Sequence, residues 1–269
     1  MKITVIAEDT ASCAGVVAEH GLSLYIETGK HTLIADTGAS STTLDNAHAL
    51  GADLSKVDTV FISHGHYDHA GGLLSFAKIN KNAKIYIHEK AFGDFYHGEK
   101  YIGVDKNIAA LPEVVKVGGD ISPDGEIFIF SGLSGKREPP EGNRLLSERL
   151  DGKEYPDEFL HEMCLVISEN GRKILISGCA HNGILNILDR YSALFGDVPD
   201  YVISGFHTVK KDGYTDKDTD NICNTAREMA LMKTVFYTGH CTGETPFEIM
   251  KGIMGDKLCA IHCGDVFEL

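Results

Sequence analysis

Six consecutive residues carry four side chains of the kinds that bind metal ions. The six residues, 64–69, directly follow an apolar run over 57–63, and the four side chains are those of His64, His66, Asp68 and His69. Residues two apart in an extended chain point to the same side, so His64 and His66 can hold one ion together. Asp68 and His69 are sequence neighbours, so the chain must turn there, and nearby glycines make turning easy. Three imidazoles and a carboxylate suit zinc, iron or manganese, and this spacing predicts a metal site.

The same layout recurs at three later places in the chain. Apolar runs over 173–176, 201–203 and 233–237 each end in a small residue and then a glycine, and a histidine follows: His181, His207 and His240. Ligand sites in α/β proteins lie beyond the carboxyl ends of the strands, so these histidines are expected to share one crevice. We predict that His181 and His240 bind metal. His207 is expected either to orient the substrate or to hold a ligand side chain in place.

Other polar residues near these motifs have two interpretations each. Cys179 and Cys241 are soft metal ligands by type, but small buried cysteines are common in protein cores, and the core role is favoured. Glu162 precedes a predicted strand and either binds metal or forms a hydrogen bond at the rim of the site. His20 has an ambiguous position. Asp36 ends a buried strand, where it is expected to accept backbone N–H bonds or to bond a ligand histidine.

The composition restricts the class of protein and its partners. The 269 residues carry a formal net charge of −14, which disfavours broad contact with nucleic acid or with anionic lipid. Seven scattered cysteines form no disulfide framework, the first residues do not resemble a signal peptide, and no apolar stretch is long enough for a membrane span. We therefore expect a cytoplasmic protein with a small-molecule substrate and no nucleic-acid or membrane partner. The oligomeric state is left open.

Strand-like and helix-like segments alternate, which predicts one α/β domain spanning 1–269, with sheets covered by helices. The predicted strands cover 2–6, 22–27, 32–35, 57–62, 84–87, 163–167, 173–176, 201–203, 233–237 and 258–262. The predicted helices cover 42–50, 70–79, 182–195, 218–231 and 244–254.

Residues 93–160 differ from the rest of the chain. Glycine, proline and charge accumulate there, and only 113–117 and 126–130 read as core segments. A long irregular segment is typical of a lid or a substrate-binding loop, and a peripheral decoration is the alternative. Its basic residues Lys136, Arg137 and Arg144 are candidates for binding a substrate phosphate. Because glutamates are interleaved with them, a solvated charged loop is the favoured interpretation.

The His-x-His-x-Asp-His segment at 64–69 resembles the mark of the metallo-β-lactamase superfamily, and Asp36 resembles its early structural aspartate. The pieces at 19–23, 178–184, 205–207 and 239–243 are similar to a subgroup named for the dihydropterin–ribofuranosylaminobenzene phosphate synthases of methanopterin biosynthesis. The resemblance runs nearly from end to end. It implies a four-layer αββα sandwich, with two mixed sheets faced by helices and the metal site at one edge.

The resemblance also implies two sets of metal ligands. One set is His64, His66 and His181 or a neighbour, and the other is Asp68, His69 and His240. Many members of the superfamily have a bridging aspartate after the strand that corresponds to 173–177, and this chain has Cys179 in that turn. We therefore expect one or two divalent metal ions, with zinc first and iron, manganese or nickel as alternatives.

The leading hypothesis is a metal-dependent hydrolase of a small molecule that carries a phosphate or a ring. A metal ion can activate water and polarise the oxygen under attack. Asp68 is expected to bind metal and orient the nucleophile, and His207 is expected to donate a proton or hydrogen bond to the leaving group. Two alternatives remain: a transferase acting on a pterin-like diphosphate, with the basic loop holding a phosphate, and a non-catalytic, metal-containing ligand sensor.

Overall fold

Two mixed β-sheets form the centre of the molecule in the computed structural model, which describes residues 1–133 and 135–269. The seven-stranded sheet has the order β17-β1-β2-β3-β4-β5-β8, antiparallel from β17 to β3 and parallel from β3 to β8. Its strands are β1 (Lys2–Ala7), β2 (Ser23–Glu27), β3 (Thr32–Ala35), β4 (Thr59–Phe61), β5 (Lys84–His88), β8 (Val114–Val117) and β17 (Val266–Glu268).

The six-stranded sheet has the order β16-β15-β14-β13-β12-β9, parallel from β16 to β13 and antiparallel from there to β9. Its strands are β9 (Ile127–Phe130), β12 (Cys164–Glu169), β13 (Arg172–Ile176), β14 (Tyr201–Ile203), β15 (Val235–Thr238) and β16 (Leu258–Ala260). The four strands that lead into the predicted histidine motifs, β4, β13, β14 and β15, all lie in the parallel parts of the two sheets.

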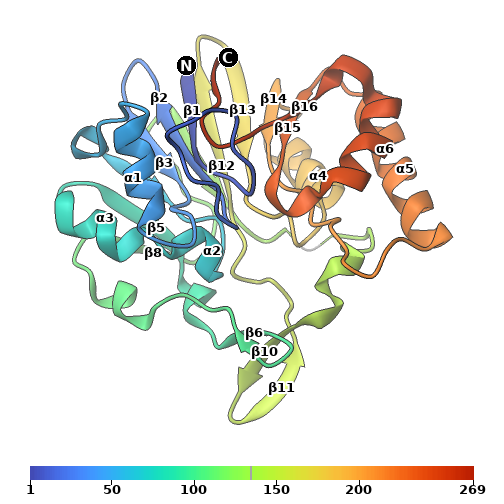
Figure 1. The fold of residues 1–269 in the computed structure, drawn as a ribbon, viewed down its shortest axis with the longest axis horizontal. Helices are drawn as coiled ribbons and strands as arrows, with labels where there is room; N and C mark the ends of the chain where they lie inside the picture. Colours follow the sequence, from blue (N-terminus) through green and yellow to red (C-terminus); the bar gives the residue numbers. More distant parts are fainter. Residues whose placement is uncertain (134) are drawn as a thin grey trace.

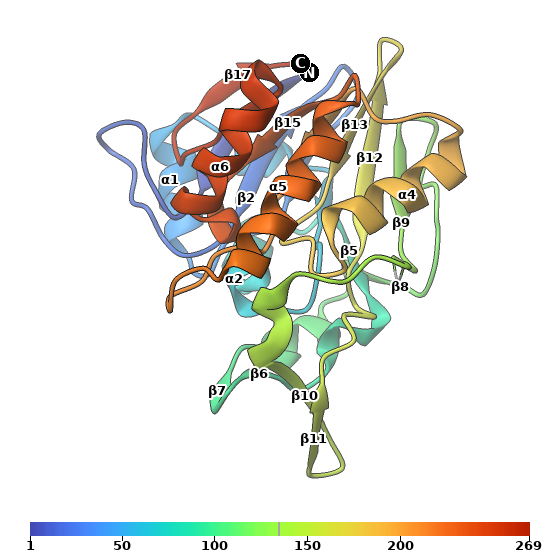
Figure 2. The same cartoon turned by 90° about the vertical axis from the view of Figure 1, so that its right-hand side faces the viewer.

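Helices cover the outer face of each sheet (Figure 1). On one side lie α1 (Thr42–Ala49), α2 (Tyr67–Ala70) and α3 (Leu73–Ile79). On the other side α4 (Ile184–Phe195), α5 (Asp216–Ala230) and α6 (Glu244–Met254) lie across the six-stranded sheet (Figure 2). Short 3₁₀ turns are η1 (Leu54–Lys56), η2 (Glu89–Phe92), η3 (Lys106–Ala110), η4 (Glu141–Leu145), η5 (His240–Thr242) and η6 (Gly255–Lys257).

Side chains alternate along the strands and build three cores between the four layers. In β13, Ile174 and Ile176 pack between the two sheets, whereas Leu175 packs under α4–α6. In β4, Phe61 faces the other sheet and Val60 faces the helices of its own side. Both faces of each sheet are therefore apolar and covered, as strands with helices on one face and a sheet on the other require. The predicted four-layer αββα fold is confirmed.

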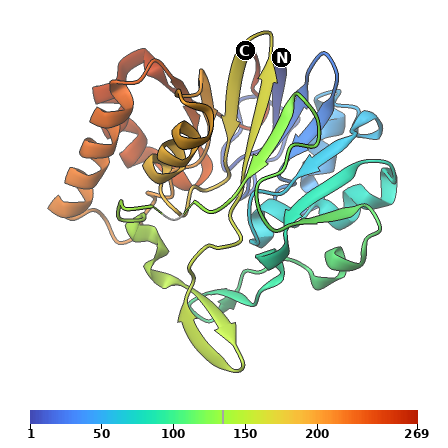
Figure 3. The same cartoon turned by 180° about the vertical axis from the view of Figure 1, so that it is seen from behind.

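All ten predicted strands and all five predicted helices are present, with boundaries that differ by a few residues. The two core segments expected within 93–160 are present as β8 and β9. The rest of this segment is less irregular than expected, because it contains all four strands of a small antiparallel sheet of order β11-β10-β6-β7, which projects from the sandwich (Figure 3). The strands of this small sheet are β6 (Phe95–His97), β7 (Lys100–Tyr101), β10 (Leu146–Leu150) and β11 (Lys153–Pro156).

These strands escaped prediction because they are short and lack an apolar alternation. β11 is exposed along its whole length, and β7 has two residues, both exposed. Ser134, within the same segment, lies outside the described residues. Among the described residues, the structure contains no helix that is both long and apolar enough to cross a membrane.

Candidate metal centre

The ends of β4, β13, β14 and β15 meet at one edge of the sandwich, and the predicted histidines lie on the loops that follow these strands. The rings of His64, His66 and His181 form a triangle, with centroid distances of 4.6 to 4.9 Å. The Nε2 atom of each ring is buried and has no hydrogen-bond partner within the described chain. Three buried imidazole nitrogens without partners are costly unless they bind something, and a metal ion fits this donor set.

Asp68, His69 and His240 form a second group beside the first. The Oδ2 atom of Asp68 lies 3.4 Å from His240 Nε2 and 3.8 Å from His69 Nε2. The rings of His69 and His64 are 4.1 Å apart, so the two groups adjoin. His20 also approaches, with its Nε2 atom 3.5 Å from Asp68 Oδ2. The structure thus brings all six predicted metal ligands into one cluster.

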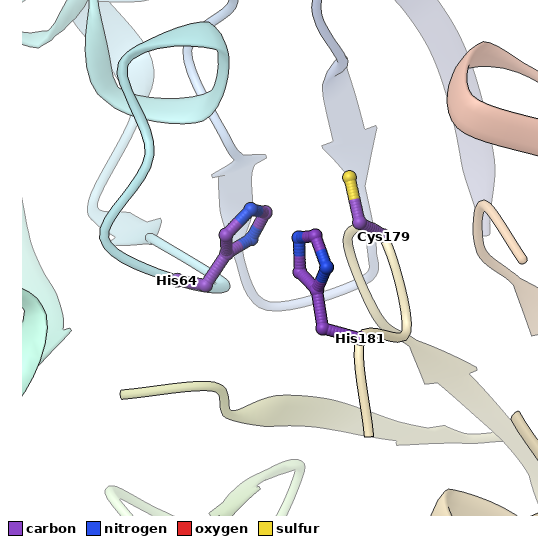
Figure 4. A group of neighbouring side chains, drawn as sticks. All are labelled: His64, Cys179 and His181. Atoms are coloured by element: carbon purple, nitrogen blue, oxygen red, sulfur yellow. The ribbon is translucent and has the colours of Figure 1, made fainter. Parts of the chain in front are cut away.

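Cys179 lies between the two groups. Its Sγ atom is 3.1 Å from His69 Nε2. The same sulfur belongs to one potential ligand cluster with His64 and His181 and to another with His69 and His240, with ligand atoms within 4.8 Å of one another in each. Figure 4 shows His64 on one loop, and His181 and Cys179 together on another. Cys179 would therefore be within reach of a metal ion held by either group of side chains, to which it could offer a thiolate ligand.

Backbone geometry at these loops is unusual for residues other than glycine. Asp36, Ala180, His207 and His240 all have φ between 48° and 58°, in the left-handed region. Such residues cost of order 1 kcal/mol each and persist only where the surroundings hold them. Gly178, two residues before Ala180 in the same turn, has no room for a side chain, because a Cβ there would collide with Ser63 Oγ. The turns therefore orient these side chains toward one point, and the backbone adopts an unfavourable φ at several residues to do so.

The second ring nitrogen of most of these histidines is bonded to a neighbouring side chain. The Nδ1 pairs are His64 with Ser63 Oγ at 2.9 Å, His69 with Asp36 at 2.6 Å, His181 with Asn143 at 3.0 Å, and His240 with Asp9 at 2.6 Å. Such bonds fix the ring orientation and leave Nε2 as the donor toward the site. The ring of His66 differs, since its Nε2 atom lies 3.7 Å from Asp157 Oδ2.

Asp36 connects β3 to both the β4 loop and a ligand histidine. Its Oδ1 atom accepts the Ser63 backbone N–H at 2.7 Å, and its Oδ2 atom accepts Ser63 Oγ at 2.7 Å and His69 Nδ1 at 2.6 Å. The backbone donor comes from the neighbouring strand end and not from the turn after Asp36. A buried carboxylate with three donors is well satisfied, so this residue fixes His69 relative to both strands.

Glu162 holds the loop that carries His181. Its two carboxylate oxygens accept the backbone N–H groups of His181 at 2.6 Å and Asn182 at 2.9 Å. Burial raises the pKa of Glu162, and the N–H bonds oppose this shift. The preceding His161 accepts the Gly65 N–H at Nδ1, so its Nε2–H points to Asp157 at 3.1 Å. Both residues hold the loops that carry the predicted metal ligands in place from the side of β12.

Residues whose side chains hold a predicted metal ligand or its loop in place are called bracing residues here, and Asp36 and Glu162 are two of them. Four more were not predicted from the sequence: Glu8, Asp9, Asn143 and Asp157. Asp9 accepts hydrogen bonds from both His240 and His20, and Glu8 accepts the His240 backbone N–H at 2.6 Å. The acidic pair directly after the first strand was the one available signal. Asn143 and Asp157 lie in the 93–160 segment, where no motif indicated a contact with the site.

The protonation states of the buried histidines and of Asp68 are set by their surroundings. Burial, together with the neighbouring histidines, lowers the pKa of His64 and of His181 well below the usual value, so both are neutral and can donate a lone pair. Burial opposes ionisation of Asp68, but His69 and His240 outweigh it and hold its pKa below its usual range. Burial lowers the pKa of His240, but Asp68 and Asp9 outweigh it and raise the value.

His207 and Cys241 lie next to the cluster on the six-stranded sheet side. The His207 ring is 4.2 Å from that of His181, and its Nδ1 atom is buried without a partner in the described chain. The Sγ atom of Cys241 is 3.6 Å from the carbonyl oxygen of Cys179. Both residues thus border the predicted metal ligands, with His207 partly exposed.

The basic residues of the 93–160 segment are engaged elsewhere. Arg137 bonds Asp189 and Glu228 on α4 and α5, each at 2.8 Å. Arg144 bonds Glu141 on the surface, and Lys136 is exposed. Arg137 also lines a pocket of about 330 Å³ between the 137–142 loop, α4 and α5. None of the six predicted metal ligands lines this pocket.

A protein-family model described as the metallo-beta-lactamase superfamily matches residues 16–221. The chain therefore belongs to the metallo-beta-lactamase superfamily, as the sequence motifs predicted.

Individual similar proteins indicate to which part of the superfamily the chain is related. An uncharacterized protein of Methanocaldococcus jannaschii is 30% identical over 249 residues, covering 90% of each chain. The 7,8-dihydropterin-6-methyl-4-(beta-D-ribofuranosyl)-aminobenzene-5'-phosphate synthase of the same organism is 28% identical, covering 100% of this chain and 96% of that protein. The crystal structure of Tm1679, a metal-dependent hydrolase of the beta-lactamase superfamily, aligns with a TM-score of 0.84 at 29% identity, covering 100% of this chain and 99% of that one. The similarity to the synthase subgroup is thereby confirmed.

Proposed function

We propose that the chain is a metal-dependent hydrolase of a small molecule that carries a phosphate or a ring. The observation that carries the proposal is one buried cluster of side chains. In it the ring nitrogens of His64, His181 and His240 that have no hydrogen-bond partner in the described chain gather around Cys179, and Asp68 Oδ2 lies 3.4 Å from His240 Nε2. His64, His66 and His181 would hold one ion, and Asp68, His69 and His240 a second, with Cys179 between them. A thiolate among imidazoles favours zinc, and iron, manganese and nickel are the alternatives.

A bound divalent ion supplies Lewis acidity, which activates water and polarises the oxygen of the bond to be broken. The residues of the chain supply the rest. Asp68, kept ionised by His69 and His240, presents Oδ2 to the site and can accept a hydrogen bond from the attacking water. The His207 ring is partly exposed and lies 4.2 Å from that of His181, so it can donate a proton or hydrogen bond to the leaving group.

Substrate screening of the metal-loaded protein tests this proposal. We expect turnover of at least one ester, lactone, phosphodiester or thioester from a broad panel. Asp68→Asn should lower kcat by about 100-fold, the usual size of a lost general base or orienting group. Glu244→Gln, a change at the start of α6, is the control and should keep the rate. Full activity of the Asp68→Asn protein with its metal retained would contradict the role of Asp68.

The synthase relative favours a second candidate, a transferase that acts on a pterin-like diphosphate, with a phosphate held by the basic loop. In the structure Arg137 and Arg144 are already paired with carboxylates, so this role requires those ion pairs to open. Incubation with a pterin diphosphate and an aminobenzene ribotide separates the candidates, since only the transferase forms a condensed product. Metal retention without any turnover would instead favour a metal-containing ligand sensor.

The partner is proposed to be a small molecule. The net charge of −14 supports this choice over nucleic acid, because an acidic surface repels a phosphate backbone.

A further inference from the structure

Two buried cysteines lie next to each other at the carboxyl end of the six-stranded sheet. Cys179 follows β13 and Cys241 follows β15, and their side chains are 3% and 4% exposed. The two sulfur atoms and a ring nitrogen of His207 lie within 4.8 Å of one another. In the structure both cysteines are free thiols.

A glycine on the intervening strand end allows the two sulfurs to meet. β14 lies between β13 and β15 in the sheet, so a side chain after β14 would normally separate residues that follow the outer strands. The residue at that place is Gly205, whose N–H donates to the carbonyl oxygen of Gly178 at 2.7 Å. A Cβ on Gly205 would collide with Cys241 Sγ. The absence of this one side chain therefore opens the space in which the sulfurs approach.

We propose that Cys179 and Cys241 form a redox-sensitive pair that a peroxide converts into a disulfide. One thiol attacks hydrogen peroxide, giving a sulfenic acid and one water. The second thiol then displaces the sulfenic hydroxyl as a second water and forms the S–S bond. Two thiols lose two electrons and two protons in all, and one peroxide becomes two waters.

The two sulfurs need only a short approach for this step. They lie within 4.8 Å of each other, and a disulfide has a sulfur–sulfur distance of about 2.05 Å, so the gap to close is less than about 3 Å. His207 borders both sulfurs and is partly exposed, so the side of the pair that it covers is the side on which a molecule as small as hydrogen peroxide would approach.

The effect of this disulfide on metal binding rests on the proposed function, in which Cys179 lies between two groups of metal ligands. A disulfide sulfur is no longer a thiolate, so oxidation would remove Cys179 from between the two ligand groups and release metal. Reduction by dithiothreitol would restore the thiol and the binding capacity. The pair would thus make metal binding depend on the presence of peroxide.

The experiment treats the metal-loaded protein with hydrogen peroxide, blocks free thiols by alkylation and identifies cross-linked peptides by mass spectrometry. A chromophoric chelator reports released metal in parallel. Cys241→Ala and Cys241→Ser are the test variants, because Ala keeps the site apolar if Ser disturbs folding. Cys223→Ser is the matched control, since Cys223 is half-buried on α5, away from these loops.

We expect a Cys179–Cys241 peptide and metal release from the wild type and from Cys223→Ser, both reversed by dithiothreitol. In the two Cys241 variants the peptide should be absent and release at least about tenfold slower. Equal release from the variants, or oxidation of other cysteines without this peptide, would overturn the proposal. The cross-link does not require metal, so a cross-linked protein that never binds metal would refute the metal centre and leave the pair standing.

Discussion

Replacing Asp36 by Asn tests how strongly the bracing residues contribute to metal binding. Asp36 receives three hydrogen bonds, from the Ser63 backbone, the Ser63 hydroxyl and His69 Nδ1. Asn keeps one oxygen, which can still accept the Ser63 N–H. Its NH₂ group cannot accept from His69, so the 2.6 Å bond that orients this ring is lost.

The size of the effect follows from the type of bond. A hydrogen bond to a charged group contributes about 1.5–3 kcal/mol, and losing such a support typically weakens metal binding about 10- to 100-fold. The two figures agree, because about 1.4 kcal/mol corresponds to a factor of ten. We expect the metal dissociation constant of Asp36→Asn to rise by that factor. Competition with a chromophoric chelator measures the constant, and urea unfolding of metal-free protein should show a loss of about 2 kcal/mol.

Asp124→Asn is the matched control for this change. Asp124 also bonds a histidine at 2.6 Å, namely His31, but on the surface far from the cluster in the fold. It should cost some stability and leave the metal dissociation constant unchanged. An Asp36→Asn protein that binds metal as tightly as the wild type would refute the reasoning that Asp36 orients a ligand.

Three further changes have defined outcomes. Asn143→Ala removes the partner of His181 Nδ1 and should raise the metal dissociation constant about tenfold in the chelator assay, whereas an unchanged constant would show that Asn143 does not hold the ring. Asp68 and Asp9 raise the pKa of His240 against the effect of burial, so in metal-free protein the protonated ring stabilises the fold below pH 6.5, and this contribution is lost as pH rises through the folded pKa. A metal ion must displace this proton, so metal affinity should increase over the same rise in pH. Calorimetry in two buffers should detect proton release on metal binding at pH 7, and no release would contradict this. Arg137→Ala breaks half-exposed ion pairs and should cost at most about 1 kcal/mol in urea unfolding with metal content unchanged, so a loss of metal would place Arg137 in the site.

Much of the centre could be predicted because its signal is local. The four ligand types at 64–69 are contiguous, and His181 and His240 repeat one layout of strand, small residue, glycine and histidine. Parallel strands bring such ends to one edge of a sheet, so spacing along the chain translates directly into proximity. The strands themselves were predictable because their two covered faces give continuous apolar runs.

The bracing residues could not be predicted in the same way. Asn143 and Asp157 contact His181 and His66 through loops whose paths are decided by tertiary packing, and neither has a flanking motif. For Glu162 the residue type left two roles open. A glutamate can bind metal, but here backbone N–H groups occupy both of its carboxylate oxygens. The small sheet of β6, β7, β10 and β11 was missed because its strands are short, and two of them, β7 and β11, are fully exposed and so carry no apolar pattern.

Elemental analysis of the protein purified without added metal tests the central claim most directly. Two ligand groups joined at Cys179 predict about two divalent ions per folded chain, zinc foremost. Cys179→Ala should lower this number, while Cys223→Ser should not. One ion per chain would restrict the centre to a single ligand group. A folded chain that holds no metal, even after loading with zinc, iron, manganese or nickel, would contradict the assignment.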